Sequence, residues 1–394
     1  MHFIDLAYQQ QRIGDKIEKN IRTVLEHGQY IMGPEVSELE KRLAAFVGVK
    51  HAVACSSGTD GLLMALMAYD VGPGDAIFTT PFTFIATAEV IQLIGATPVF
   101  VDIDPETYNI NPQDLERAIL AVKQNDPTVH PLPALNACGN ENTRALTAKG
   151  VIAVDLYGLA ADFKQINAIA KRHGLFVIED AAQSFGAETE GEGKAGALAD
   201  IGCTSFFPAK PLGCYGDGGM CFTDDSRLAG LMRSISLHGK GSDKYENVRI
   251  GINGRLDTLQ AAILLAKFDI FPEEIELRRA VAQSYTDLLS SSSLTTPHVP
   301  DGYRSAWAQY SLLAESESQR SIIQDRLKEA GIPTAVYYPK PLHQQNAFAS
   351  LRYKSGDFPI SEDCAKRVFS VPMHPYLKDD DLRLIARHLT GTSD

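Results

Sequence analysis

The lysine with the clearest chemical setting is Lys210, which stands between Pro208 and Pro211 in the segment SFFPAKPLGCYGDGG (205–219). An apolar run, 201–207, leads into it, and four glycines follow it. Prolines and glycines restrict and redirect the backbone, so this lysine is expected in a sharply turning loop. An amine held away from water has a lowered pKa and can act as a nucleophile or a proton carrier. The alternative is an ordinary surface lysine in a glycine-rich loop.

A second candidate is the segment SSGTDGL (56–62), in which an expected strand ends and an expected helix begins. The first backbone N–H groups of a helix have no intrahelical acceptor, so a helix start with small hydroxyl residues can bind an anion. The alternative is ordinary capping of the helix by Ser57 or Thr59.

A third candidate is Asp180 in IEDAAQS (178–184), at the carboxyl end of an otherwise apolar strand. Ligands bind at these strand ends in parallel sheets, and a carboxylate buried there needs a partner. A helix cap or a buried salt bridge would also account for it.

These three features agree on one ligand, pyridoxal phosphate. Its phosphate binds backbone N–H groups, its pyridine nitrogen needs an acid partner, and its aldehyde forms a Schiff base with a lysine.

The order of motifs along the chain is more specific than any single motif. The sequence contains SSGTDGL, PFTFIAT, DLYG, EDAAQSFGA, SFFPAKPLGCYGDGG, LHG and GINGRLDTLQAAIL. This set resembles the sugar aminotransferase family of fold-type I pyridoxal-phosphate enzymes associated with the names DegT and StrS. The resemblance runs from FIDLAYQQ near the start to YYPKPLHQQNAF near residue 345.

The resemblance implies a role for each matching residue of the cofactor site. Lys210 matches the lysine that bonds the cofactor, Asp180 the acid beside the pyridinium nitrogen, and Gln183 the residue near the ring hydroxyl. The remaining matches are the phosphate cradle (Gly58, Thr59 and Ser205) and the aromatic residue that stacks on the ring (Phe84), for which a core phenylalanine is the alternative.

The resemblance also implies a homodimer with shared active sites, because Asn253 matches a residue that reaches the phosphate of the neighbouring subunit. A nucleotide-linked sugar carries a diphosphate and needs a local cationic patch. Arg255 and His238 are the first candidates for substrate binding, followed by Tyr338 and His343, and a structural role is the alternative for each.

The activity implied by the resemblance is transfer of an amino group from L-glutamate to a keto group of a nucleotide-linked sugar. The form of the Lys210 segment is most similar to enzymes that aminate C3 of UDP-2-acetamido-2-deoxy-3-oxo-glucuronate in O-antigen synthesis. The alternatives are amination at C4, a pyridoxal-phosphate-dependent sugar dehydratase, and a regulatory protein that only binds the cofactor. The dehydratase branch typically has histidine in place of the lysine, which counts against it.

The elements that must position these residues follow an α/β pattern. Seven short apolar runs are expected strands: 51–55, 76–80, 97–103, 151–157, 175–180, 201–207 and 219–223. Helical patterns between them (60–69, 114–122 and 163–173) predict a large domain with a mostly parallel sheet flanked by helices.

Two domains are expected, a large pyridoxal-phosphate-binding domain over 1–260 and a smaller C-terminal α/β domain over 261–394. Residues 123–150 are rich in Asn, Pro and Thr and have no steady period, which predicts a surface insertion.

Composition excludes several classes of function. The formal net charge of -12 over 394 residues disfavours a nucleic-acid or anionic-membrane surface. No CxxC pair is present, so no metal site is expected and the six cysteines are predicted to be buried thiols. Without an apolar stretch of about 18 residues or a signal pattern, a cytoplasmic protein is expected.

Overall fold

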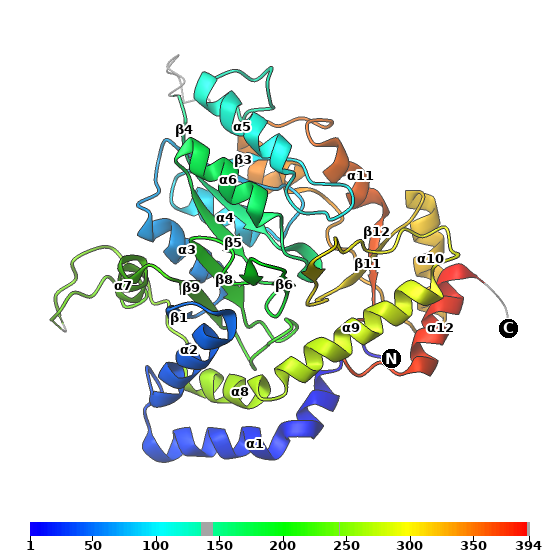
Figure 1. Cartoon of the computed structure of the whole chain (residues 1–394), viewed down its shortest axis with the longest axis horizontal. Coiled ribbons are helices and arrows are strands. Elements are labelled where there is room, and N and C mark those ends of the chain that lie inside the picture. Colours follow the sequence, from blue (N-terminus) through cyan, green and yellow to red (C-terminus); the bar gives the residue numbers. More distant parts are fainter. Residues whose placement is uncertain (135–144, 244, 392–394) are drawn as a thin grey trace.

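The computed structural model describes residues 1–134, 145–243 and 245–391, and it is built around one seven-stranded sheet (Figure 1). The strand order is β1-β9-β8-β5-β4-β2-β3. Four neighbouring pairs are parallel, and β9 is antiparallel to both of its neighbours, so the predicted mostly parallel sheet is confirmed. The strands are β1 (His51–Cys55), β2 (Asp75–Thr79), β3 (Thr97–Phe100), β4 (Thr147–Val154), β5 (Phe176–Asp180), β8 (Ile201–Ser205) and β9 (Gly219–Thr223).

Helices cover both faces of this sheet, because alternate residues of each strand point to opposite sides. One apolar core joins the sheet to α3 (Gly58–Ala68), α4 (Ala86–Leu93) and α7 (Ser226–Ile235). On the other face the sheet packs against α5 (Pro112–Gln124) and α6 (Phe163–His173), and further along against α2 (Pro34–Val47) and α8 (Thr258–Phe268). The long helix α1 (Leu6–His27) runs beneath α8 in Figure 1.

A smaller unit follows the sheet, with a two-stranded antiparallel sheet of β11 (Tyr310–Leu313) and β12 (Val368–Val371). Its core is completed by α9 (Phe271–Leu288), α10 (Glu317–Glu329) and α12 (Asp379–Thr390). The remaining elements are α11 (Pro359–Arg367), the short helices η1 (Leu156–Gly158), η2 (Leu342–Gln344) and η3 (Asn346–Leu351), and a small sheet of β6 (Glu188–Thr189), β7 (Gly193–Lys194) and β10 (Tyr303–Arg304).

The expected boundary at residue 260 falls inside α8, whose apolar residues belong to the core of the large sheet. The first turns of α9 join the same core through Phe271 and Ile275, whereas its later residues, such as Tyr285, pack in the second core. We therefore propose that the two domains meet within α9.

The predicted insertion over 123–150 is shorter in the structure than the sequence suggested. Its first residues complete α5 up to Gln124, and its last residues open β4 at Thr147, which pairs with Asp75 of β2. His130 is buried, and its Nε2 lies 2.8 Å from the Phe100 carbonyl oxygen. Residues 135–144, in the middle of the predicted insertion, lie outside the described residues.

The described ranges contain no helix long and apolar enough to span a membrane and no cluster of His, Cys, Asp and Glu suited to a metal ion. Five of the six cysteines are described there as buried free thiols, and Cys138 lies outside the described residues.

Candidate active site

The loop that carries Lys210 connects β8 to β9, and two backbone hydrogen bonds of Phe206 hold it closed. The Phe206 N–H donates to the Gly218 carbonyl at 2.7 Å, and its own carbonyl accepts from the Cys214 N–H at 2.8 Å. Inside this closed loop the Lys210 N–H donates to the Phe207 carbonyl at 2.8 Å, which forms a tight turn. The loop therefore fixes the backbone from which the lysine side chain projects.

The glycines after Lys210 are required by close packing. A Cβ atom on Gly213 would lie 2.4 Å from the Pro208 carbonyl oxygen, and one on Gly219 would lie 2.6 Å from the carbonyl carbon of Ser57. Neither glycine has a positive φ. Gly213 thus allows the loop to fold on itself, and Gly219 brings β9 against the start of α3.

The Lys210 side chain interacts electrostatically with Asp180, which ends β5 and is buried. Burial lowers the pKa of Lys210, and the nearby Asp180 carboxylate partly opposes that shift. Burial also raises the pKa of Asp180. The structure thus brings together the lysine and the acid that the sequence predicted, with Asp180 buried and Lys210 partly buried.

The Asp180 carboxylate is held by two donors. The Thr87 hydroxyl of α4 donates to its Oδ2 at 2.8 Å, and the Ala182 N–H donates to its Oδ1 at 3.2 Å. The Thr87 hydroxyl also lies 3.1 Å from that of Thr83, and both threonines are buried. Both donors favour the charged form of Asp180 and oppose the effect of burial.

We expect Thr87→Val to raise the pKa of Asp180 further, because the carboxylate loses a donor that favours its charged form. The affinity for pyridoxal phosphate should fall about five- to tenfold, the equivalent of one hydrogen bond. Fluorescence titration of the cofactor-free protein measures this change. Thr87→Ser keeps the hydroxyl and is expected to bind as the wild type does; equal losses in both variants would contradict the assigned role.

A second part of the site is formed by Gln183, which is buried one turn after Asp180. Its Oε1 accepts the Tyr157 N–H at 2.9 Å, and its Nε2 donates to the Tyr338 hydroxyl at 3.4 Å. The Tyr338 ring lies 6.4 Å from the ring of Phe84, which is 54% exposed. Burial raises the pKa of Tyr338, and the Asp180 charge adds to this effect. Tyr338 therefore lies beside the predicted cofactor residues.

The third part is the start of α3. Ser57 caps the helix, with its hydroxyl accepting the Asp60 N–H at 3.0 Å. This confirms the capping alternative for Ser57, while the N–H groups of Gly58 and Thr59 remain in the first turn, where no intrahelical acceptor exists. A Cβ atom on Gly58 would lie 2.8 Å from the Ser205 Cβ, so the helix start packs tightly on the end of β8.

Three other predicted residues lie on the loop between α7 and α8, which projects to the left in Figure 1. Asn253 and His238 are exposed, and the Arg255 side chain is partly buried, with its Nε lacking a hydrogen-bond partner. The Ser56 N–H donates to the Gly254 carbonyl at 3.1 Å, which places Asn253 and Arg255 next to the start of α3.

His343 is not brought to this site. Its side chain is 0% exposed, and its Nε2 lies 3.0 Å from a carboxylate oxygen of Glu362 on α11. Its ring also contacts Phe358. These contacts fix the short helix η2 against α11, so the observed surroundings of His343 are structural, unlike the substrate role expected from the sequence.

Comparison with known proteins agrees with this geometry. The DegT/DnrJ/EryC1/StrS aminotransferase family model matches residues 11–390. The chain belongs to this family. It is 48% identical, over 99% of its length and 100% of the relative, to a UDP-2-acetamido-2-deoxy-3-oxo-D-glucuronate aminotransferase of Pseudomonas aeruginosa.

Two further similarities extend over the same length. A protein of Geobacillus stearothermophilus named pleiotropic regulatory protein is 42% identical, over 98% of this chain and 96% of the relative. The crystal structure of a DegT DnrJ EryC1 StrS aminotransferase from Brucella abortus has a TM-score of 0.91 and 47% identity, with 99% of each chain covered. The fold is therefore that of the sugar aminotransferases.

Pyridoxal phosphate is the cofactor of this family member, and the residues of the site fit it. The first-turn N–H groups of Gly58 and Thr59 suit a phosphate. The buried Asp180 carboxylate suits a protonated ring nitrogen, and Lys210 supplies a desolvated amine.

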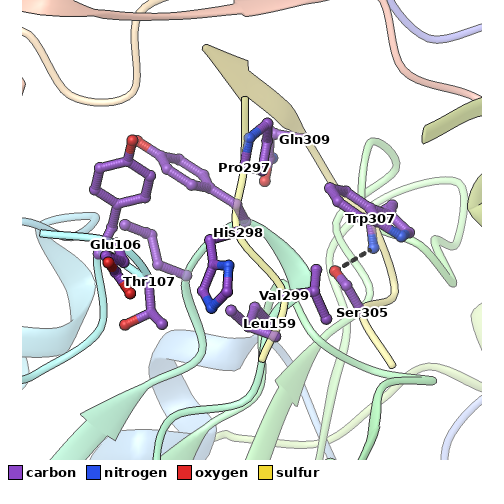
Figure 2. A pocket seen from close by; sticks show the side chains of 12 residues that line it. Glu106, Thr107, Leu159, Pro297, His298, Val299, Ser305, Trp307 and Gln309 are labelled. Carbon is purple, nitrogen blue, oxygen red and sulfur yellow. Dashed lines mark hydrogen bonds between the residues drawn. The ribbon is translucent and has the colours of Figure 1, made fainter. Parts of the chain in front are cut away.

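A separate small hollow is lined by Tyr157 and by residues of the loops 104–108 and 297–309 (Figure 2). Figure 2 shows Trp307, His298 and Gln309 around it, with the Trp307 N–H donating to the Ser305 hydroxyl at 3.0 Å. None of the cofactor-site residues named above except Tyr157 lines it.

Sequence reasoning missed Thr87 and Tyr157 as site residues. Thr87 lies in PFTFIAT, from which only Phe84 was used, although a hydroxyl residue stands there in an otherwise apolar helix face. Tyr157 lies in DLYG and contributes its backbone N–H, which no pattern of side-chain types could reveal.

Proposed function

We propose that this protein transfers the amino group of L-glutamate to the C3 keto group of UDP-2-acetamido-2-deoxy-3-oxo-glucuronate, for the synthesis of a surface polysaccharide such as O-antigen. The observation that carries the proposal is the pairing of the partly buried Lys210 with the buried Asp180, in a chain 48% identical to the Pseudomonas aminotransferase named for that substrate. The products are 2-oxoglutarate and the 3-amino sugar, so atoms and electrons balance without a further reactant.

Bound pyridoxal phosphate supplies an aldehyde that accepts the amino group and a ring that withdraws electrons from the bonds made there. With the cofactor bound, Lys210 would hold its aldehyde carbon, and Lys210 Nζ would take the proton from the α-carbon of glutamate and return it to that aldehyde carbon. Its lowered pKa supports this role, because a neutral amine is needed to accept the proton.

The Asp180 carboxylate would keep the ring nitrogen of the bound cofactor protonated. Gln183 and Tyr338, which are hydrogen-bonded to each other, would border the same site. Gly58, Thr59 and Ser205 would hold the phosphate, and Phe84 would offer an exposed ring for stacking.

The two half-reactions give a direct test of this proposal. Protein loaded with pyridoxal phosphate and given only L-glutamate should release one 2-oxoglutarate per site and then stop until the keto sugar is added. Continued release without the sugar, or no release, would count against the proposal.

We also propose a homodimer in which Asn253 reaches the partner's phosphate site. Val248 and Ile250, on the projecting loop, are 51% and 84% exposed, and Ile31, which pairs with Asp257 at the end of that loop, is 48% exposed. Exposed apolar residues are common at protein–protein interfaces, which supports the proposal. Sedimentation should show a dimer, and Ile250→Asp should shift it toward the monomer.

We further propose a cytoplasmic location. The cysteines that the structure describes are buried free thiols, which are typical of a reducing compartment.

Arg255 is expected to bind the diphosphate of the sugar substrate, since it follows Gly254, whose carbonyl accepts from Ser56 just before α3, and its Nε has no hydrogen-bond partner. Arg255→Ala should raise KM for the nucleotide sugar about 10- to 100-fold, the loss of a charged hydrogen bond. The half-reaction with glutamate should change less than about twofold. Arg255→Lys should recover only part of the affinity; equal effects on both substrates would contradict this assignment.

A regulatory role is the second candidate, because the Geobacillus relative carries a regulatory name. A regulator that only binds the cofactor would take it up at Lys210 but leave glutamate unchanged. The half-reaction above therefore separates the two functions.

A further inference from the structure

Two carboxylic acids that the mechanism does not use lie directly behind the cofactor-binding edge of the sheet. β4 and β5 pair in parallel, with Ala153 opposite Glu179 and Val154 opposite Asp180. Because side chains alternate along a strand, Asp155 and Glu179 share one face of the sheet and Asp180 points to the other. Both Asp155 and Glu179 are 0% exposed.

Each acid is held by its own donors. Glu179 accepts the Gly196 N–H at 2.6 Å on Oε1 and the Leu198 N–H at 3.0 Å on Oε2. Asp155 accepts the Ala161 N–H at 2.9 Å on Oδ1 and the Ser184 hydroxyl at 2.7 Å on Oδ2.

The two carboxyl groups are close enough to interact electrostatically. Both are fully buried, and neither takes part in an ion pair with a described residue. Two neighbouring buried carboxylates without a cation repel each other, so we infer that the pair keeps one proton.

The electrostatic surroundings also favour one retained proton in this pair. Burial raises the pKa of Asp155, and the neighbouring Glu179 charge raises it further. Burial raises the pKa of Glu179 to about 7. Asp180, Cys203 on β8 and Tyr303 on β10 are titratable groups that interact with the pair, and none of these three is a cation.

The pair is connected to the cofactor site by short contacts. The Asp155 N–H donates to the Asp180 carbonyl at 3.1 Å, and the Asp155 side chain holds Ser184, the residue that follows Gln183. Two residues after Asp155, the Tyr157 N–H holds the Gln183 side chain. Asp155 thus connects the DLYG loop, through hydrogen bonds, to the turn that carries Asp180 and Gln183.

We propose that Asp155 and Glu179 share a single proton and act as a positioning pair, which sets the orientation of Asp180 and Gln183 toward pyridoxal phosphate. The neutral member can donate to the charged one, so both acids have hydrogen-bond partners although neither is exposed to solvent. This inference rests on the proposed function only in that Asp180 and Gln183 contact the cofactor.

The first test asks whether one of the two acids is protonated. Infrared spectroscopy of the full-length cofactor-free protein at pH 6 detects the C=O stretch of protonated carboxylic acids. The wild-type band should contain a component that disappears in the double variant Asp155→Asn/Glu179→Gln, which has neither acid left to hold the proton. Glu192→Gln, at an exposed glutamate, is the matched control and should keep that component. A spectrum that the double variant does not change would overturn the shared proton.

The same proton should make the free energy of unfolding depend on pH. A raised carboxyl pKa stabilises the fold below the ordinary pKa near 4 to 4.5, and this contribution is lost as pH rises through about 7. Folding at pH 6 should therefore take up about one proton fewer in the double variant Asp155→Asn/Glu179→Gln than in the wild type. Equal uptake in these two proteins would contradict the proposal.

The positioning role is tested by cofactor affinity and by conservative rescue. Asp155→Ala should weaken pyridoxal-phosphate binding about tenfold, while Asp155→Asn, which imitates the neutral acid, should stay within about threefold. Equal losses in both variants would overturn the positioning role. Because this readout needs neither glutamate nor a sugar, it stays valid if the proposed substrates are wrong.

Discussion

Replacing Lys210 with alanine is expected to lower the rate of the glutamate half-reaction by at least about 10³-fold, since one group serves as both the attachment point and the proton carrier. Stopped-flow absorbance of the cofactor with L-glutamate measures this rate. The fold should survive, because the loop is held by the backbone bonds of Phe206 and not by the lysine side chain.

Two comparisons make the Lys210 prediction specific. Lys171→Ala, on the exposed face of α6, should leave the rate unchanged. Added methylamine should restore part of the Lys210→Ala activity, because a free amine can carry the proton. A Lys210→Ala protein as fast as the wild type would refute the role of this residue.

Asp180→Asn is expected to lower the same rate by about 10²- to 10⁴-fold, the range for a group that controls a proton in the reaction. Asparagine keeps the shape and can accept from Thr87, but it brings no negative charge to hold the ring nitrogen protonated. The variant should therefore bind the cofactor and react slowly, which separates its effect from unfolding.

The same substitution should also change the pH dependence of Lys210. The Asp180 charge raises the pKa of Lys210 against the lowering effect of burial. Without that charge the pKa falls further, so the amine becomes neutral at lower pH. The rate at which the cofactor-free protein captures pyridoxal phosphate should then reach its plateau at lower pH in Asp180→Asn; a shift to higher pH would contradict this account.

Much of the fold could be predicted because strands and helices here follow simple periods. The strands at 51–55 and 219–223 and the helix at 163–173 have the bounds that the pattern indicated. The start of β4 was missed by four residues, since Thr147 to Gly150 (TAKG) carry little apolar character and form a strand only by pairing with β2.

The site was predictable where a residue type alone indicates chemistry, as for Lys210 and Asp180. It was not predictable where tertiary contact decides the role. Thr87 approaches Asp180 from a helix 93 residues earlier, and the Asp155–Glu179 contact joins two strands. His343 shows the converse, because its partner Glu362 comes from another helix and buries a side chain that the motif suggested for substrate.

Amino transfer to the sugar is tested most directly by isotope labelling. The wild-type protein and Lys210→Ala are each given ¹⁵N-labelled L-glutamate and UDP-2-acetamido-2-deoxy-3-oxo-glucuronate, and the mass of the sugar is measured by mass spectrometry. We expect a 3-amino sugar with one ¹⁵N atom per molecule from the wild type, together with an equal amount of 2-oxoglutarate, and no labelled sugar from Lys210→Ala. A sugar that returns unlabelled or dehydrated, from a protein shown to hold the cofactor, would contradict it.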